Sequence, residues 1–470
     1  MFQYDFSNHQ NRHIQIEDMP EEYYSRIQKT TKEDIFYPVW HIAPKCGLMN
    51  DPNGLCQIDG IHHIFYQWFP AGPVHGLKHW YHVKTRDFIH YEDAGVAMYP
   101  ENVFDSYGCY TGMAFKEQGK TYLYYTGIQG EEQIPNTCYA EFDGEKIWNR
   151  KKLFTTNSSV TTRNYRDPYV WKKDDTYYMI VGGESPNHQG ILLMYAGNVP
   201  DQFAYIGNVD IGDYPFGYML ECPNYYEENG RGILFFSPMG IKGKNKYDFK
   251  NVFSVVYAIG EPLDIKNKSF QYKNFYEVDK GFDFYAPQSY KDEKHRRILF
   301  GWLGNSKNAY PTDKNNWAHM MTMPRVLTWE KNRLVQTPPI ELQQLRRAGR
   351  QLCDWQEIKE CSFEIVCNPE EEFEIEIGNN RGDNICFSAN KKEYCLDRSH
   401  MTHLYAEQFG TVRYAVRLEK TQEMRIFADH SSLEIFCDGG KTVFTTRMFI
   451  EKVSYIKTKG VKGTFYHLKC

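Results

Sequence analysis

The arrangement of hydrophobic and polar positions repeats five times along the chain. Each copy has a short strand-like stretch, a polar turn and a second stretch rich in aromatic and β-branched residues, which is typical of a β-hairpin. The copies are DPNGLCQIDGIHHIFYQW from Asp51, YTGMAFKEQGKTYLYYTG from Tyr110, RDPYVWKKDDTYYMIVGG from Arg166, ECPNYYEENGRGILFFSP from Glu221 and YAPQSYKDEKHRRILFGW from Tyr285. Their starts lie 59, 56, 55 and 64 residues apart, which leaves room for a four-stranded propeller blade. Residues 35–335 are therefore predicted to form a five-bladed β-propeller, and an irregular β-sandwich with unrelated hairpins is the alternative.

The pattern changes after about residue 350. Segments such as CSFEIVC, EEFEIEIG and SSLEIFCDGGKTVFTTR alternate apolar and polar residues, and Asp438-Gly439-Gly440 predicts a hairpin turn. We expect an all-β sandwich over residues 351–470, joined to the propeller by a linker over 336–350. Residues 1–34 are predicted to be a polar leader with a short helix around PEEYYSRIQKT, with Pro20 in its first turn.

Composition and charge narrow the class of protein. With a net charge of -5, the chain gives no electrostatic reason to expect a nucleic acid or an acidic membrane surface as partner. No apolar run approaches the roughly 18 residues of a membrane span, and the N-terminal residues lack the pattern of a secretion signal. None of the 12 cysteines forms a C-x-x-C pair, so we expect reduced thiols in a cytoplasmic protein rather than a zinc or disulfide framework.

Three acidic residues occupy similar places in the repeats. Asp51, Asp167 and Glu221 are each expected just before the first strand of a hairpin. Equivalent positions of successive blades surround one end of the central channel, so these carboxylates are predicted to face one cavity. The stretch Asp51-Pro52-Asn53-Gly54 also has the residue order of a tight β-turn, which would hold Asp51 at the mouth of the first blade.

Carboxylates around one cavity favour glycoside hydrolysis. Two carboxyl groups, one ionised and one protonated, are the minimum that this reaction needs, and their mutual repulsion separates their pKa values. A magnesium or calcium site is the alternative, with Asn50 and Asn53 as further ligands. However, the chain has no D-x-D-x-D loop, and Arg166 next to Asp167 suits a carboxylate or sugar hydroxyls better than a dication. We therefore predict no metal and no cofactor.

Three short motifs resemble the signatures of glycoside hydrolase family 32, the invertases and fructanases. They are Asn50-Asp51-Pro52-Asn53-Gly54, Arg166-Asp167-Pro168 and Glu221-Cys222-Pro223. Similar stretches are FYQW at 65–68, HWYHVKTRDFIHYED at 79–93, YAPQS at 285–289, GW at 301–302, WAHMMTMPRVLT at 317–328 and the later SSLEIFCDGG. The resemblance covers about residues 35–450 and independently implies a propeller followed by a sandwich. Within the family, FPAGPVHGLKHW and the missing secretion signal are most similar to intracellular sucrose-6-phosphate hydrolases.

The resemblance also implies a reaction and roles for single residues. It implies a retaining β-fructofuranosidase that releases fructose from sucrose 6-phosphate or sucrose, with its two catalytic carboxyls roughly 5 to 5.5 Å apart. Asp51 would be the nucleophile, Glu221 the general acid and then base, and Asp167 the residue that holds fructose hydroxyls. The implied substrate-binding residues are Asn50, Gln67, Tyr110, Thr111, Arg166 and Trp302. Cys222 is expected to be a small packed residue behind the acid.

The part of the site that holds the leaving group is the least defined. The chain has Leu48 and His75 at two positions where many family members have Trp. His75 and Lys78, with His79 and His82 nearby, are candidates for a phosphate-binding rim, and a solvated loop is the alternative.

The same site residues would also serve a fructosyltransferase or a fructan exo-hydrolase. An arabinanase-like furanosidase and a non-catalytic carbohydrate-binding propeller are further alternatives. In each case the partner is a small carbohydrate, and the sequence does not predict an oligomeric state.

Overall fold

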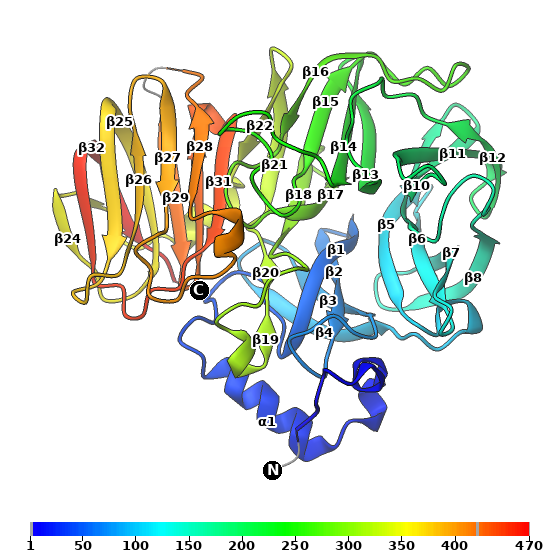
Figure 1. Cartoon of the computed structure of the whole chain (residues 1–470), viewed down its shortest axis with the longest axis horizontal. Helices are drawn as coiled ribbons and strands as arrows, with labels where there is room; N and C mark the ends of the chain where they lie inside the picture. Colours follow the sequence, from blue (N-terminus) through cyan, green and yellow to red (C-terminus); the bar gives the residue numbers. More distant parts are fainter. Residues whose placement is uncertain (1–2, 420–422, 470) are drawn as a thin grey trace.

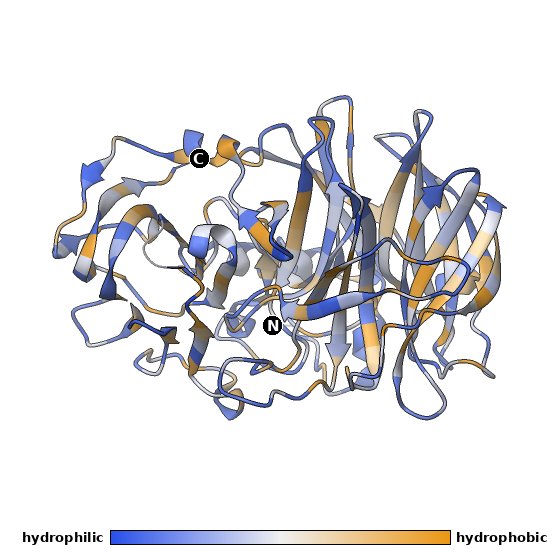
Figure 2. Ribbon diagram, turned by 90° about the horizontal axis from the view of Figure 1, so that it is seen from above, coloured by the Kyte–Doolittle hydropathy of each residue, from blue (hydrophilic) through white to orange (hydrophobic). Residues whose placement is uncertain are grey.

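Five antiparallel sheets are arranged around a central channel, and a β-sandwich packs against the side of this ring (Figure 1). The computed structural model describes residues 3–419 and 423–469. The prediction of an all-β chain, with a five-bladed β-propeller followed by a C-terminal β-sandwich, is confirmed. Figure 2 shows hydrophobic residues interleaved with hydrophilic ones along the blade strands, while the loops are mainly hydrophilic.

Each blade is built from consecutive strands, of which the first is innermost. Blade one contains β1 (Gly47–Ile58), β2 (Ile61–Phe69), β3 (His79–Thr85) and β4 (Tyr91–Met98), and blade two contains β5 (Cys109–Glu117), β6 (Lys120–Gln129), β7 (Ile134–Phe142) and β8 (Ile147–Thr155). Blade three contains β9 (Tyr165–Lys173), β10 (Thr176–Glu184), β11 (Gly190–Val199) and β12 (Gln202–Asn208), and blade four contains β13 (Met219–Glu228), β14 (Arg231–Met239), β15 (Val256–Gly260) and β16 (Tyr272–Glu277). Blade five contains β17 (Tyr285–Lys291), β18 (Arg297–Leu303), β21 (Arg325–Glu330) and β22 (Arg333–Thr337). The innermost strands of neighbouring blades contact one another in a closed ring.

A β-bulge interrupts every innermost strand close to its start. The register with the second strand slips after Met49, Cys109, Arg166, Glu221 and Tyr285. A bulge adds one residue to a strand and leaves it unpaired, so a proline there removes no hydrogen bond from the ladder.

The residues Asp51 to Gly54 lie within β1, so the predicted tight turn is wrong. This stretch forms a bulge instead, because turn residues also suit an irregular strand. Asp167 and Glu221 likewise lie inside β9 and β13 rather than before them.

Short segments close the ring and cover one side of it. Residues of β19 (Trp317–Ala318) pair in parallel with β1, and residues of β20 (Met320–Met321) pair with β18, so this stretch links the last blade to the first. Helix α1 (Glu21–Lys32) lies below blade one in Figure 1 and buries Tyr23, Ile27 and Thr31, with Pro20 at its N-cap rather than in its first turn. The 3-10 helices are η1 (His9–His13), η2 (Ile16–Asp18), η3 (Val103–Asp105), η4 (Asp313–Asn315), η5 (Ile340–Leu345), η6 (Glu407–Phe409) and η7 (Asp438–Gly440).

The sandwich is organised around one long strand. Its strands are β23 (Arg350–Gln351), β24 (Trp355–Glu357), β25 (Ser362–Gly378), β26 (Asn384–Ala389), β27 (Glu393–Asp397), β28 (Val412–Val416), β29 (Met424–Asp429), β30 (Ser432–Cys437), β31 (Thr442–Arg447) and β32 (Tyr455–His467). Strand β25 pairs with β29 along its first half, with β26 along its second half and with β32 on its other edge. Residues 438–440 connect β30 to the antiparallel β31, which confirms the predicted hairpin turn.

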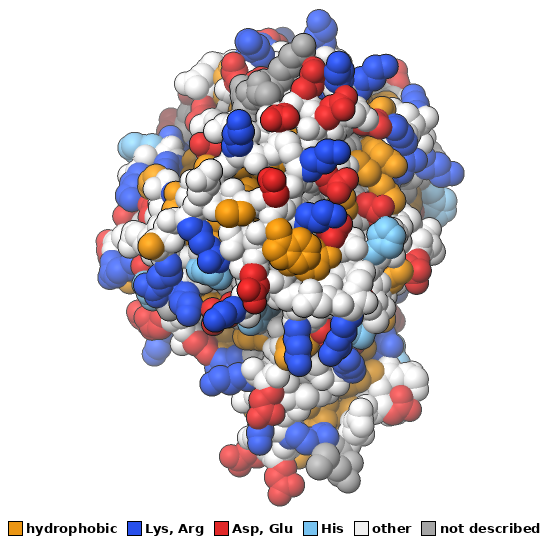
Figure 3. Space-filling model, turned by 90° about the vertical axis from the view of Figure 1, so that its left-hand side faces the viewer, with side chains coloured by type: hydrophobic (Ala, Val, Ile, Leu, Met, Phe, Trp, Pro, Cys, Tyr) orange, Lys and Arg blue, Asp and Glu red, His pale blue; other side chains and the backbone are white. Residues whose placement is uncertain are grey.

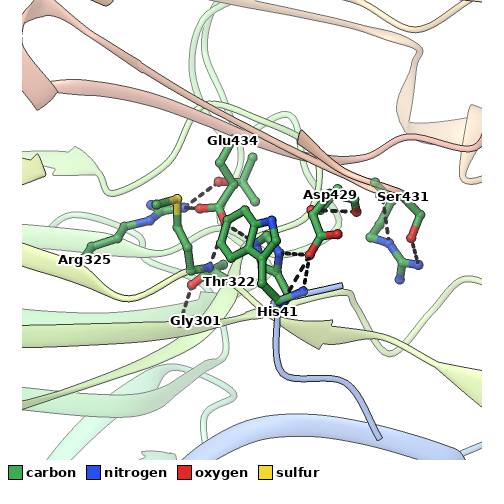
Figure 4. Close-up of polar contacts among 12 residues, drawn as sticks. His41, Gly301, Thr322, Arg325, Asp429, Ser431 and Glu434 are labelled. Carbon is green, nitrogen blue, oxygen red and sulfur yellow. Dashed lines mark hydrogen bonds and ion pairs between the residues drawn. The ribbon is translucent and has the colours of Figure 1, made fainter. Parts of the chain in front are cut away.

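A buried network of charged residues joins the propeller to the sandwich. We call His41, Asp279, Arg325, Asp429 and Glu434 the interdomain charge cluster. Figure 4 shows four of them, His41, Arg325, Asp429 and Glu434. Arg325 donates to Asp279 Oδ2 at 3.1 Å and to Glu434 Oε2 at 2.7 Å. The imidazole of His41 lies 2.8 Å from Asp429 Oδ2 and 3.2 Å from Glu434 Oε1. Burial alone would lower the pKa of His41, but hydrogen bonds to the two carboxylates outweigh it and raise that pKa to about 9.

The outer surface has no dominant charge on the face that Figure 3 shows, where basic and acidic side chains are interspersed over the sandwich end. This distribution agrees with the small net charge of -5. Within residues 3–419 and 423–469, no helix is both long and apolar enough to cross a membrane.

Candidate active site

The bulges turn two consecutive residues of each innermost strand toward the channel. In chain order these pairs are Asn50 and Asp51, Tyr110 and Thr111, Arg166 and Asp167, Glu221 and Cys222, and Tyr285 and Ala286. A regular strand would direct one residue of each pair away from the channel, because side chains alternate between the two faces. The expectation that all three acids share one place in the repeat is wrong, because Glu221 is the last paired residue before its bulge, whereas Asp167 lies one residue and Asp51 two residues past the last paired one.

Left-handed backbone conformations mark three of these bulges. Asp167, Cys222 and Ala286 have φ angles of 70°, 47° and 45°. Such angles are uncommon for residues other than glycine and persist where the surrounding structure enforces them, often at functional sites.

Asp51 is held by neutral hydrogen-bond donors. Its Oδ1 accepts from Asn50 Nδ2 at 3.0 Å, and its Oδ2 accepts from the Thr111 hydroxyl at 2.5 Å. Gln67 connects these two partners, since it accepts from Asn50 at 3.0 Å and donates to Thr111. Lys78 Nζ donates to Asn50 Oδ1 at 2.6 Å, so Asn50 is fixed from both sides. These contacts leave Asp51 an oriented carboxylate on the wall of the channel.

Glu221 is held by a cation and a phenol instead. Arg166 donates from both Nε, at 2.8 Å, and Nη2, at 2.7 Å, to Glu221 Oε1. Tyr285 donates its hydroxyl hydrogen to Glu221 Oε2. Sequence analysis assigned no role to Tyr285, although it precedes Ala286-Pro287 just as Glu221 precedes Cys222-Pro223. The two carboxyl groups thus have different surroundings, which is what an acid and a nucleophile need.

Asp167 and Cys222 lie between these two groups. The backbone N–H of Cys222 donates to Asp167 Oδ2 at 2.9 Å, and the Asp167 backbone N–H donates to Thr126 Oγ1 at 2.9 Å. The Cys222 thiol lies 3.5 Å from Asp167 Oδ2 and 3.7 Å from Asp51 Oδ2. Cys222 is buried within a hydrophobic cluster, as expected of a packed residue behind the acid, and its thiol also contacts two carboxylates. Within the described part of the chain, the other oxygen of Asp167, Oδ1, is buried and has no partner.

Burial changes the ionisation of this group of side chains. It raises the pKa of Asp51, against hydrogen bonds from Thr111 and Asn50 that lower it. Burial and the nearby carboxylates also raise the pKa of Asp167, although Arg166 opposes them. Burial lowers the pKa of Lys78 to about 7 and raises that of the Cys222 thiol well above its ordinary value. Asp51 and Lys78 line one cavity, and the Cys222 thiol, which contacts Asp167, lies next to Asp51, so the perturbed groups form one cluster, as expected of a catalytic site.

The cavity beside Asp51 has a volume of about 330 Å³ and brings most of the predicted site residues together. It is lined by Asn50, Asp51, Gln67, His75, Lys78, Tyr110, Thr111 and Arg166, together with His9, Arg12, His13, Gly76, Tyr107 and Gln133. Of the three predicted acids, Asp167 and Glu221 do not line it. Trp302 does not line it either but lies behind His75, with ring centroids 5.9 Å apart. The leader residues of the lining were missed from the sequence, because a polar segment with a single short helix gives no sign of where it packs.

The candidate phosphate residues do not form an exposed rim. His75 and Lys78 line the cavity, but Lys78 Nζ contacts Asn50 and lies 3.0 Å from His75 Nδ1. His79 and His82 lie outside the cavity lining, since His79 Nδ1 contacts Leu77 O and His82 stacks on Phe65 at 4.2 Å. His75 and Lys78 precede β3, whereas His79 and His82 lie within this buried strand, so the four residues do not act as one patch.

Carboxyl groups gather at one end of a five-bladed propeller, and two of them have different hydrogen-bond partners. This arrangement defines a glycoside hydrolase. Residues 41–338 match the glycosyl hydrolases family 32 N-terminal domain, and residues 337–469 match the family 32 C-terminal domain. The chain therefore belongs to glycoside hydrolase family 32, as the three sequence motifs predicted.

Several known proteins are similar over nearly the whole chain. The chain is 40% identical to a sucrose-6-phosphate hydrolase of Vibrio alginolyticus, over 96% of this chain and 94% of that protein. It is 33% identical to a sucrose-6-phosphate hydrolase of Staphylococcus xylosus, over 97% and 96% of the two chains. The solved structure of a sucrose-6-phosphate hydrolase from Lactobacillus gasseri superposes with a TM-score of 0.92 at 27% identity, covering 97% and 98% of the two chains.

Proposed function

We propose that this chain is a β-fructofuranosidase that hydrolyses sucrose 6-phosphate, and sucrose with lower efficiency, to release fructose. The observation that carries the proposal is the pair of carboxyl groups at one channel mouth, with Asp51 held by neutral donors and Glu221 held by Arg166 and Tyr285. The names of the relatives with 40% and 33% identity support the phosphorylated sugar as substrate.

The reaction follows a double displacement. Asp51 attacks the anomeric carbon of the fructosyl unit while the bond to the glucosyl oxygen breaks, and Glu221 gives its proton to that oxygen. Water then attacks the same carbon, Glu221 takes a proton from the water, and the ester to Asp51 breaks. Two inversions leave the configuration of the sugar unchanged.

Asp167 is assigned to the sugar rather than to proton transfer. Its Oδ2 is occupied by the Cys222 backbone, whereas Oδ1 has no partner among the described residues and is available to a fructose hydroxyl. Filling this acceptor would remove the cost of an unpaired buried oxygen, which gives the site affinity for a hydroxyl group at this place.

Replacement of the nucleophile tests the proposal. Asp51→Asn is expected to lower glucose 6-phosphate release from sucrose 6-phosphate by roughly 10³-fold or more, because no ester can form. Asp143→Asn, at an exposed turn that follows β7, is the matched control and should keep wild-type turnover. Near wild-type turnover of the Asp51→Asn enzyme would reject the assignment.

Trapping with methanol tests the stereochemistry and separates the alternatives. Retention yields methyl β-fructofuranoside, and the α anomer would contradict the double displacement. Product analysis at high sucrose concentration distinguishes hydrolysis from transfer, since a fructosyltransferase would form oligosaccharides.

We also propose that the enzyme acts in the cytoplasm. The cysteines in the described part of the chain are all free thiols, which is typical of a reducing compartment. Fractionation of the source cells, with activity on sucrose 6-phosphate as readout, is the direct test.

A further inference from the structure

The N-terminal leader forms one wall of the active-site cavity. Helix η1 (His9–His13) contributes His9, Arg12 and His13 to the lining of the cavity that also contains Asp51. Because these residues lie some forty positions before the first propeller strand, their place in the site is a property of the fold and not of the catalytic motifs.

The leader is fixed in this position by specific contacts. The backbone N–H of Leu77 donates to Arg12 O at 2.7 Å, and the ring of His13 stacks on Tyr107 with centroids 4.1 Å apart. Asn8 caps η1 by accepting from Gln10 N at 3.1 Å. These contacts attach η1 to blade one on one side and to the entry of blade two on the other.

Two glycines of the FPAGPVHGLKHW stretch allow the leader to approach so closely. A Cβ atom at Gly72 would lie 2.2 Å from the Phe6 ring, and one at Gly76 would lie 2.5 Å from Arg12 O. Any other residue at these positions would displace the leader. The sequence of blade one is thus adapted to the presence of η1 beside the cavity.

The leader side of the cavity is rich in cationic and imidazole groups. Among the described residues that line it, Asp51 is the sole carboxylate, and it lies at the catalytic end. The adjoining hollow has no such excess, since Glu131 and Glu132 line it together with Arg163 and Arg166. A dianion entering the mouth is therefore attracted most strongly to the leader side of the cavity.

Arg12 is the cation that is free to bind an anion. Its Nε donates to Phe6 O at 2.7 Å, which aligns the guanidinium, and within residues 3–419 and 423–469 its two terminal nitrogens make no hydrogen bond. Lys78 and Arg166 are already bound to Asn50 and Glu221. His13 Nδ1 is buried and has no partner among the described residues, so a second donor or acceptor faces the same place. A guanidinium with two free nitrogens is suited to a phosphate group.

We infer that Arg12, with His9 and His13, binds the phosphate of the glucosyl 6-phosphate group, so that the leader determines the preference for phosphorylated substrate. The inference rests on the proposed function, because it assumes that the fructosyl unit lies at Asp51 and the glucosyl unit points to the mouth. It assigns the phosphate to Arg12 rather than to Lys78, which is buried and contacts Asn50, or to His75, whose Nδ1 contacts Lys78.

Comparison of the two sugars tests the inference. For Arg12→Gln, kcat/KM for sucrose 6-phosphate is expected to fall roughly 10- to 100-fold, mainly through KM, because a charge-assisted hydrogen bond to phosphate is lost. The value for sucrose, which lacks the phosphate, should change far less. Arg163→Gln removes the same charge from the adjoining hollow, outside the lining of the active-site cavity, and is the matched control, for which the ratio of the two sugars should not move. Arg12→Lys keeps the charge but lacks the planar N–H donors of the guanidinium. Its kcat/KM for sucrose 6-phosphate should lie between those of the wild type and Arg12→Gln.

The outcomes separate failure of the inference from failure of the proposed function. Equal losses on both sugars would show that Arg12 only shapes the cavity, and an unchanged preference for sucrose 6-phosphate would place the phosphate elsewhere; both overturn the inference. A wild-type enzyme that hydrolyses neither sugar would overturn the proposed function. In that case calorimetry can still decide the inference, by measuring how sucrose 6-phosphate and sucrose bind to Asp51→Asn with and without Arg12→Gln. The inference is supported only if the phosphorylated sugar binds more tightly and Arg12→Gln removes that difference in affinity. Thermal unfolding of each variant checks that the fold is intact.

Discussion

Replacement of Arg325 by methionine should destabilise the interface between the propeller and the sandwich. Arg325 is fully buried and donates to four acceptors, of which Asp279 and Glu434 are carboxylates, while Gln336 and Thr445 are neutral. Methionine fills a similar volume but leaves Asp279 buried without its cation and leaves Glu434 with His41 alone. Removing one partner of a buried ion pair typically costs about 3–5 kcal/mol, because the remaining charge stays desolvated.

This free energy translates into a modest change in melting temperature. The entropy of unfolding is about 2.1 cal/mol/K per residue, or about 1 kcal/mol/K for 470 residues. A loss of about 3–5 kcal/mol therefore lowers Tm by about 3–5 °C. Differential scanning calorimetry of the wild type and Arg325→Met measures this shift directly.

The control lies on the neighbouring strand of the same blade. Arg333 stacks on Tyr276 at 3.5 Å from the ring centroid, and its side chain is not part of the interdomain charge cluster. Arg333→Met should cost about 1 kcal/mol or less, which is within about 1 °C of the wild type. A Tm for Arg325→Met that matches this control would refute the view that Arg325 compensates the two buried carboxylates.

Three further changes have defined outcomes. His41→Ala should remove a stabilising contribution that is complete below about pH 6.5 and lost as the pH rises through about 9, because the folded-state pKa of His41 is raised. Urea denaturation at pH 6 and pH 9.5 measures this difference in the free energy of unfolding. Lys78→Met should move the acidic limb of the kcat/KM profile to higher pH, because the Lys78 charge lowers the pKa of Asp51 and the nucleophile must be ionised. Iodoacetamide at pH 7.5 should label Cys353, which is exposed, and spare Cys222, whose buried thiol has a raised pKa; peptide mass spectrometry distinguishes the two.

Each of these results has a comparison that would contradict it. His90→Ala, at an exposed site, should leave the pH dependence of stability as in the wild type, and an equal effect of both variants would exclude a special role for His41. Lys116→Met removes a charge at the other end of the channel and should not move the acidic limb. Labelling of Cys222 at the rate of Cys353 would show that the catalytic channel opens to reagents.

The repeats made the blades predictable, because each hairpin alternates apolar and polar residues and closes with aromatic residues. The bulges were not predictable in the same way. Asp51-Pro52-Asn53-Gly54 contains turn residues, and the same residues serve a bulge in a strand whose two faces are both covered. Tertiary packing against the other inner strands decides between these outcomes, and it is not encoded in four neighbouring residues.

The candidate site was predicted in its central part and missed at its edges. The acids were predicted from the repeats, whose blade arrangement brings them to one end of the channel, and Asn50, Gln67 and Thr111 were predicted from the resemblance to the family. The position of Arg12 depends on contacts with distant loops, including the space left by Gly76, which local sequence does not reveal. The same limit applies to Lys78, whose contact with Asn50 arises only when the segment before β3 folds back toward β1.

The bulges also limit how the length of this chain can change in evolution. Each pair of channel-facing residues at a bulge depends on one extra residue in an innermost strand. Deletion of that residue would restore regular alternation and turn one member of the pair out of the channel. Insertions in the outer hairpins, by contrast, leave the pairs untouched. We therefore expect length differences among descendants of this sequence to collect at the rims of the blades, while the residue count around each bulge stays fixed.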